Sequence, residues 1–148
     1  MKRFPDCEEY KDDNKIVLKE NNSKLTFRNP KRDKILLITV DGCAISDDEN
    51  KRCDYALVCS NGVEIYVELK GSKIKHAFEQ IESTIKLLSD NPQTIKKWCF
   101  VVSTRVPKLT TNIQNIKSKF KNKYNATLIV YKTPYTDDLS KYTIQEKI

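Results

Sequence analysis

The chain has 148 residues, a charged fraction of 32% and a net charge of +7, with an isoelectric point near 9.1. These values argue against long disorder and fit one soluble domain, residues 1–148, whose positive field attracts polyanions such as nucleic acid or an anionic membrane. The chain has neither an 18-residue apolar run nor an apolar segment after Met1-Lys2-Arg3, so we expect no membrane span, no secretory signal and a cytoplasmic protein.

Five cysteines lie at positions 7, 43, 53, 59 and 99. No two of them form a Cys-x-x-Cys pair, and an odd number at wide spacing argues against a disulfide framework. A zinc site would have to combine scattered thiols with His76, the single histidine. We therefore expect reduced and mostly buried thiols.

The first 24 residues are polar and weakly specified, with one possible helical turn over 7–11 and a short apolar run at 16–18. The core is expected over residues 25–133. It begins with strands at 25–27 and 35–40, the second apolar enough to be buried on both faces, and a polar loop over 46–52 follows. Two further strands, 55–59 and 63–69, flank Asn61-Gly62, a strong hairpin signal, and should pair antiparallel.

The later half of the chain alternates helices and strands. Apolar residues recur at helical spacing from Ile74 to Leu88 until Asn91-Pro92 ends the pattern, and again from Ile113 to Tyr124. Strands are expected at 98–103 and 126–132. Because this order contains βαβ units, it predicts an α/β fold with a central mixed β-sheet flanked by helices on its faces.

The predicted hairpin carries the strongest indication of function. Side chains alternate along a strand, so Glu68 and Lys70 share a face, and Asp54 at the start of the partner strand is folded back toward them. Two carboxylates in such a position repel each other unless a hard divalent cation binds their oxygens. We expect Mg²⁺ or Mn²⁺ here, bound by Asp54, Glu68 and the backbone carbonyl of Leu69, with Lys70 stabilising charge on a reacting phosphodiester.

The acid-x-Lys spacing alone is uninformative, because it also occurs at 9–11, 13–15 and 49–51. Only the triplet that begins at Glu68 lies in an apolar strand, beside a strand that carries an acid and before a glycine and a helix. In these features the chain resembles the PD-(D/E)XK nuclease superfamily, whose core is a mixed sheet flanked by helices with an acid on one strand and the triplet on the next. The resemblance covers about residues 35–132.

The resemblance implies a Mg²⁺-dependent endonuclease of restriction endonuclease-like or Holliday junction resolvase-like type, with Asp54 and Glu68 as metal ligands and Lys70 as the catalytic lysine. The chain departs from the pattern at Cys53, where the superfamily has proline, a substitution that the superfamily tolerates.

Further acidic ligands remain open. Many members of the superfamily place an acid on a helix before the sheet; Glu20 is the candidate here, although Glu8 and Glu9 are also available. Asp41, at the end of a buried strand, is either a ligand or a turn residue before Gly42.

On the helix after the triplet, Lys73, His76 and Gln80 lie at i, i+3 and i+7 and can face the site. Gln80 is the preferred catalytic candidate, whereas His76 also fits a boundary position. Some exonuclease branches carry Gln-x-x-x-Tyr on this helix, but the fourth position after Gln80 is Thr84, so the branch is not assigned.

Several basic residues could neutralise phosphates, with a solvated helix face as the alternative interpretation. The candidates are Lys73, Arg105, Lys108, Lys117 and Lys121. Trp98, Phe100 and Tyr131 lie in predicted strands and are expected in the core rather than as base-stacking residues.

The leading hypothesis is a metal-dependent nuclease that acts on DNA, with RNA not excluded. One alternative is a non-catalytic nucleic-acid-binding module or subunit on the same fold. Another is a basic protein that binds an acidic protein partner. Cleavage of both strands by an enzyme with one site per chain would favour a homodimer, and the sequence does not separate a structure-selective enzyme from a restriction-type one.

Overall fold

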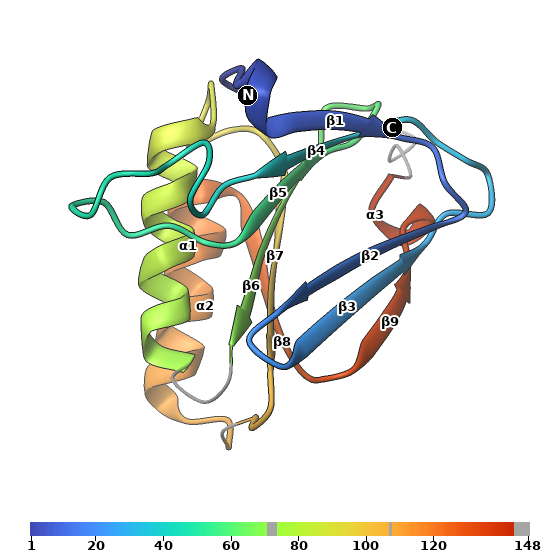
Figure 1. Ribbon diagram of the computed structural model, residues 1–148. Coiled ribbons are helices and arrows are strands. Elements are labelled where there is room, and N and C mark those ends of the chain that lie inside the picture. Colours follow the sequence, from blue (N-terminus) through green and yellow to red (C-terminus); the bar gives the residue numbers. More distant parts are fainter. Residues whose placement is uncertain (71–73, 107, 144–148) are drawn as a thin grey trace.

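The computed structural model describes residues 1–70, 74–106 and 108–143. Six strands form a mixed sheet in the order β1-β4-β5-β6-β7-β8 (Figure 1). Strands β4, β5 and β6 are antiparallel neighbours, β7 and β8 continue the sheet parallel to β6, and β1 pairs antiparallel with β4 at the opposite edge. The strands in sheet order are Glu8–Lys11, Ile35–Thr39, Tyr55–Val58, Glu64–Lys70, Lys97–Ser103 and Ala126–Lys132. The predicted α/β class with a central mixed sheet is confirmed.

Two long helices, α1 (Ile74–Leu88) and α2 (Thr111–Tyr124), cover one face of this sheet (Figure 1). Their apolar residues share one core cluster with the sheet residues Tyr66 and Cys99. The helix α2 begins where the Thr110 hydroxyl accepts a hydrogen bond from the Ile113 amide at 3.2 Å, which satisfies one free amide of its first turn. We expected helices on both faces, whereas both long helices lie on one face.

The opposite face is covered by a second sheet in the order β2-β3-β9. Strands β2 (Lys15–Glu20) and β3 (Ser23–Arg28) form a hairpin, and β9 (Tyr135–Asp138) pairs parallel with β3. Along β2 exposed and buried residues alternate, with Ile16 and Leu18 facing the core. The protein therefore has three layers, with helices, the six-stranded sheet and the three-stranded sheet in that order.

The amino-terminal segment is more regular than its composition indicates. The helical turn predicted over 7–11 is wrong, because a 3-10 turn at Pro5–Cys7 is followed by the strand β1. A short helix, α3 (Ser140–Thr143), completes the elements. Among the described residues, no helix combines the length and apolar character needed to cross a membrane.

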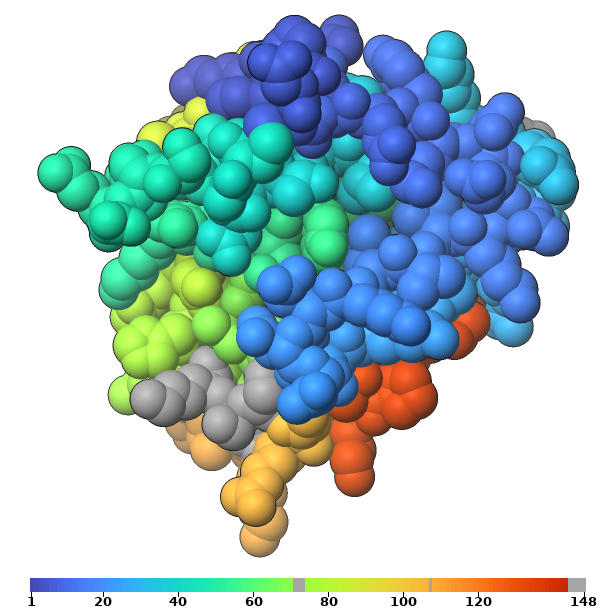
Figure 2. All heavy atoms as spheres, in the orientation of Figure 1, coloured from blue at the N-terminus to red at the C-terminus, as the bar shows by residue number. Residues whose placement is uncertain are grey.

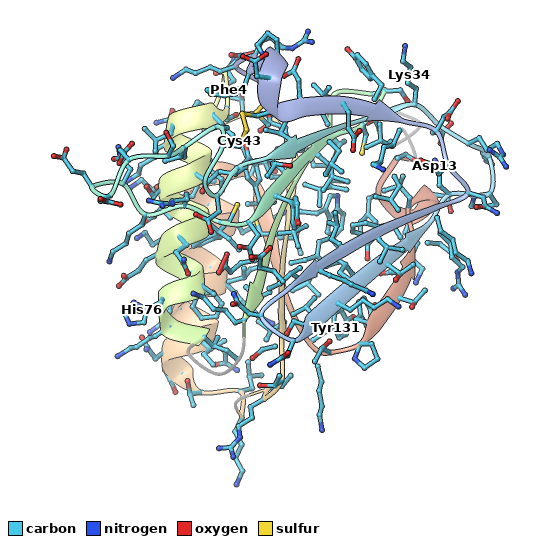
Figure 3. All side chains as sticks on the ribbon, in the orientation of Figure 1. Phe4, Asp13, Lys34, Cys43, His76 and Tyr131 are labelled. Atoms are coloured by element: carbon cyan, nitrogen blue, oxygen red, sulfur yellow. A yellow bond between two sulfur atoms is a disulfide. The ribbon has the colours of Figure 1, made fainter. Side chains whose placement is uncertain are left out.

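Cys7 and Cys43 form a disulfide, so the prediction of reduced thiols is wrong for this pair. Cys7 immediately precedes β1 and Cys43 follows β4, and the pairing of these strands brings their Cα atoms to 5.6 Å across a sequence separation of 36 (Figure 3). Cys53, Cys59 and Cys99 are buried free thiols, as predicted.

We expect unfolded protein without reductant to expose three reactive thiols, and five after reduction. Because the disulfide closes a 36-residue separation, Cys7→Ser should lower the free energy of unfolding by about 4 kcal/mol on the loop-entropy model. Thiol titration and chemical denaturation measure the two quantities. Cys43→Ser removes the same bond and should give a matching loss, and five reactive thiols without reductant would contradict the pairing.

Candidate functional site

The β5–β6 hairpin positions the candidate acids. Its turn contains Gly62 at a φ of 88°, a conformation that favours glycine, and the Asn61 side chain accepts a hydrogen bond from the Val63 amide at 3.1 Å. The resulting register pairs Tyr55 with Val67. Consequently the residue before β5, Asp54, lies opposite Glu68.

The Asp54 side chain is fixed by the backbone of β6. The Asp54 amide donates to the Val67 carbonyl at 3.1 Å, and the Leu69 amide donates to Asp54 Oδ2 at 2.8 Å. The second of these bonds replaces a sheet hydrogen bond with a bond to a carboxylate. This bond therefore holds the Asp54 carboxyl group at the end of the sheet where β5 begins.

Asp54 and Glu68 are buried at 6% and 1% exposure, with their carboxyl groups within hydrogen-bonding reach of each other. Burial raises the pKa of Asp54 to about 6, against the opposing effect of the Leu69 amide. Burial, followed by the negative charge of Asp54, raises the pKa of Glu68 to about 8. Both shifts have the same meaning: the pair lacks enough positive charge to keep both groups ionised at neutral pH.

Lys70 lies beside Glu68, as strand alternation predicts. Lys70 Nζ is 3.2 Å from Glu68 Oε2, and the Lys70 side chain is 20% exposed whereas that of Glu68 is 2% exposed. The amine thus lies nearer to solvent than the carboxyl group. The other oxygen, Glu68 Oε1, is buried without a hydrogen-bond partner among the described residues, so it is available to a ligand.

The tip of the β2–β3 hairpin contacts the end of β6. Asn21 Nδ2 donates to the Leu69 carbonyl at 3.3 Å, and Ser23 Oγ donates to the Lys70 carbonyl at 2.7 Å. In a strand the amide and carbonyl of one residue point to the same side. The Leu69 carbonyl therefore points to the side on which its amide meets Asp54.

The two secondary acidic candidates lie at the rim of the site. Glu20, at the end of β2, and Asp41, which forms an ion pair with Arg52 at 2.9 Å, are both exposed. Their negative charges nevertheless contribute to the raised pKa of Asp54. Within the described ranges, no group of three or more His, Cys, Asp or Glu side chains is placed to bind one metal ion.

Figure 2 shows the segments on either side of the site. The loop that follows β4 and the β2–β3 hairpin lie on two sides, and residues of β5 and β6 are visible between them. Gln80 of α1 lines a hollow of about 410 Å³ together with Asp41 and Arg52, and Gln80 Oε1 is buried without a hydrogen-bond partner among the described residues. The helix thus adds a second unpaired oxygen, from a residue that lines the same hollow as Asp41.

His76 and Lys73 were also predicted to face the site from this helix. His76 is exposed on α1 and points away from the sheet (Figure 3), so it does not join the acids. Lys73 lies outside the described residues.

Thr84 is a positioning residue that we did not predict. Its hydroxyl, fully buried, accepts a hydrogen bond from the Cys53 amide and donates one to the Gln80 carbonyl, both at 2.8 Å. Thr84 therefore ties the residue before Asp54 to the helix that carries Gln80. The sequence feature that could have identified Thr84 is its position as a polar residue on the apolar face of an amphipathic helix, one turn after Gln80.

The predicted nucleic-acid-binding residues lie around α2 and the loop before it. Arg105, Lys108 and Lys121 are exposed and Lys117 is half-buried. Arg105 lines a hollow of about 470 Å³ that also includes residues of α1 and α2. The helix α2 packs on β8, which is two strands away from β6 in the sheet.

Three aromatic residues were expected in the core, and the structure agrees for only some of them. Phe100 is fully buried and Trp98 half-buried, whereas Tyr131 is 39% exposed, so the expectation that Tyr131 belongs to the core is wrong. It lies near the end of β8, which is an edge strand of the six-stranded sheet that the structure describes.

No family model, curated protein or solved structure matches this chain.

We expect the metal-free protein to become less stable as the pH rises from about 5 to about 8.5. The unfolded pKa of a carboxyl group is about 4, so both raised groups bind protons more tightly in the folded state. The tighter proton binding contributes fully to the free energy of unfolding below the unfolded pKa of about 4. This contribution is lost as the pH rises through the folded pKa values of about 6 for Asp54 and about 8 for Glu68. Thermal unfolding in chelator at several pH values measures this slope.

Glu68→Gln removes one of the two titrating groups and should flatten the slope. Glu9→Gln is the matched control, because Glu9 is an exposed strand residue beside a lysine, and it should leave the slope unchanged. A wild-type stability that stays constant across this range would contradict the raised pKa values.

Proposed function

We propose that this protein is a metal-dependent nuclease that hydrolyses phosphodiester bonds, with DNA as its substrate. The observation that carries the proposal is the buried contact between the carboxyl groups of Asp54 and Glu68, with Lys70 Nζ 3.2 Å from Glu68 Oε2. A buried acid pair is costly without a compensating cation, and strongly perturbed carboxyl groups gather at functional sites. The net charge of +7 favours a polyanionic substrate.

The oxygens at this position fit Mg²⁺ or Mn²⁺. Glu68 Oε1 has no hydrogen-bond partner among the described residues, the Asp54 carboxyl group lies beside it, and the Leu69 carbonyl points to the same side. Hard divalent cations prefer such carboxylate and carbonyl ligands. When bound, the metal would polarise the phosphodiester and lower the pKa of a coordinated water.

The protein's own residues would divide the remaining work. Asp54 and Glu68 would hold the cation and release their protons as it binds, because a ligating carboxyl group must be ionised. Lys70, the more exposed partner of Glu68, would offset negative charge that develops on the phosphate. Gln80, with an unpaired carbonyl oxygen, would accept a hydrogen bond from water or substrate.

The order of elements supports a restriction endonuclease-like core and the resemblance to the PD-(D/E)XK superfamily. Asp54 directly precedes β5, the triplet Glu68–Lys70 ends the antiparallel neighbour β6, and α1 and a parallel strand follow. The three-stranded sheet on the second face departs from the expected flanking helices. That departure leaves the face that carries Glu68 and Lys70 unchanged.

We expect wild-type protein to cleave at least one of plasmid, linear duplex, single-stranded, branched or RNA substrates with Mg²⁺ or Mn²⁺ present. Asp54→Asn, Glu68→Gln and Lys70→Ala should each reduce cleavage about a hundredfold or more, the scale of losing one electrostatic contact to a transition state. The asparagine keeps an oxygen that can accept the Leu69 amide hydrogen bond, so loss of activity would not reflect loss of that bond.

The chain provides a matched control triplet. Glu9 and Lys11 on β1 have the same spacing and form an ion pair at 3.4 Å, but Glu9 is exposed. Glu9→Gln and Lys11→Ala should retain full cleavage. Activity that survives all three changes at Asp54, Glu68 and Lys70 would reject the proposal.

A non-catalytic nucleic-acid-binding module is the second candidate. The observation in its favour is that only two acidic side chains meet at the site, and that the described residues contain no group of three or more potential metal-binding side chains. Metal binding separates the two functions.

For the nuclease, we expect calorimetry to show Mn²⁺ binding to wild-type protein with an apparent heat that varies with the buffer, because the carboxyl pair releases protons as metal binds. Glu68→Gln should lose this binding, and Glu9→Gln should retain it. Absence of binding to wild-type protein, or equal binding to Glu68→Gln, would favour the binding module.

A further inference from the structure

A stacked pair of tyrosines lies near the end of β8. The ring centroids of Tyr131 and Tyr135 are 3.8 Å apart and the ring planes differ by 10°. Tyr131 is 39% exposed and Tyr135 is half-buried, so Tyr131 is the outer ring. One face of Tyr131 contacts its partner and the other can accept a flat ligand.

The inner ring is held in place by a buried carboxylate. The Tyr135 hydroxyl donates to Asp137 Oδ2 at 3.1 Å. Asp137 is 3% exposed and also accepts hydrogen bonds from the Tyr142 hydroxyl and the Asp138 amide, and it pairs with Lys141 at 2.8 Å. The pair is therefore preorganised, and a ligand that stacks on it would lose little side-chain entropy in the protein.

The tyrosine pair lies at the same end of the six-stranded sheet as the candidate site but on its opposite face. Tyr131 is in register with Leu69 and Val102, which pack toward the three-stranded sheet, whereas Glu68 and Lys70 alternate to the face covered by the helices. Leu69 pairs with Val102, which pairs with Tyr131, so two strand spacings, about 10 Å, separate the backbones at Leu69 and Tyr131. The β2–β3 hairpin contacts both regions: Ser23 Oγ donates to the Lys70 carbonyl at 2.7 Å and the Lys24 amide donates to Thr133 Oγ1 at 2.8 Å.

Two exposed lysines lie near the tyrosine pair, in addition to the Asp137–Lys141 ion pair behind the inner ring. Lys132 is next to Tyr131 in the chain and Lys24 is held next to Thr133. Both lysines are exposed and neither forms an ion pair within the part of the chain that the structure describes. An aromatic face beside cations suits a nucleotide, because the base stacks and the lysines attract its phosphate.

We propose that Tyr131, supported by Tyr135, is a stacking platform for an unpaired nucleotide, and that the nucleic acid bound by this protein carries a single-stranded segment. A base inside a duplex has both faces covered by its neighbours, so only an unpaired base can use the platform. This inference rests on the proposed nuclease function for the role of the platform, although binding to it requires no cleavage.

Fluorescence anisotropy in chelator tests the platform, using DNA as single strand, blunt duplex and duplex with an unpaired extension. Tyr131→Ala should weaken binding of the single strand and the extended duplex about tenfold, the scale of one base–aromatic stack, and change binding of the blunt duplex less than twofold. Tyr131→Phe keeps the ring and should bind like wild type. Tyr131→Leu keeps apolar bulk without a flat face and should bind like Tyr131→Ala, so a folding defect of one variant does not decide the result.

Tyr10 provides the matched control. It is a 55% exposed tyrosine with a lysine, Lys34, over its ring, but it lies on β1, at the other edge of the sheet from β8. Tyr10→Ala should leave all three affinities unchanged. In wild-type protein, a fluorescent base analogue moved along the extension should change its emission at one position, and that change should disappear in Tyr131→Ala.

The platform is rejected if Tyr131→Ala changes no affinity, if it weakens single strand and duplex equally, or if Tyr131→Phe is as weak as Tyr131→Ala. Failure of the nuclease proposal gives a different result, because wild-type protein would then cleave no substrate with Mg²⁺ or Mn²⁺. A Tyr131 effect on binding without cleavage would retain the platform and reject the nuclease. Cleavage without a Tyr131 effect on binding would reject the platform alone.

Discussion

The contact between the Asp54 and Glu68 carboxyl groups is the constraint on which the rest of the site depends. Both groups are buried in a sheet whose other interior positions are mainly apolar, and neither acid can ionise there without cost. The Leu69 amide and Lys70 offset part of that cost. The remainder is a loss of stability that an apolar pair in the same positions would avoid. A stability cost of this kind is characteristic of residues retained for binding or chemistry.

Three separate parts of the chain position the Asp54–Glu68 pair, and each of them fixes a different part of the site. The β5–β6 turn sets which acids face each other. The helix α1 holds the backbone before Asp54 through the Thr84 hydroxyl, and the β2–β3 hairpin holds the Leu69 and Lys70 carbonyls through Asn21 and Ser23. The site is thus positioned from both faces of the sheet although its acids belong to one hairpin.

The parts of the fold that were predictable are those specified by local patterns. Apolar runs identify the strands β4 to β8, helical spacing identifies α1 and α2, and Asn61-Gly62 sets the hairpin register that brings Asp54, Glu68 and Lys70 together. The strands β1, β2 and β9 are short and largely polar, and they become strands through pairing with distant segments. The disulfide follows from one of those pairings, β1 with β4, so cysteine spacing alone could not reveal it.

The errors at the site have equally specific causes. His76 lies about 200° around the helix from the buried Ile74. Its exposure could therefore have been predicted from helix geometry. Tyr131 resembles a core residue in its strand, but β8 is at the edge of the sheet that the described residues form. The contact of Thr84 with Cys53 requires knowing how α1 crosses the sheet, which no local pattern contains.

The parallel pairing of β3 with β9 has a consequence for the order in which the protein assembles. Arg28 and Asp138 are neighbours in the second sheet although they are 110 residues apart in the chain. The strands that carry the two acids are complete by residue 70, yet the hairpin that covers their outer face gains its parallel neighbour only when residues 135–138 emerge from the ribosome. During synthesis the acid-bearing meander therefore precedes its cover, and β9, made after the other strands that the structure describes, completes the layer over the centre of the sheet.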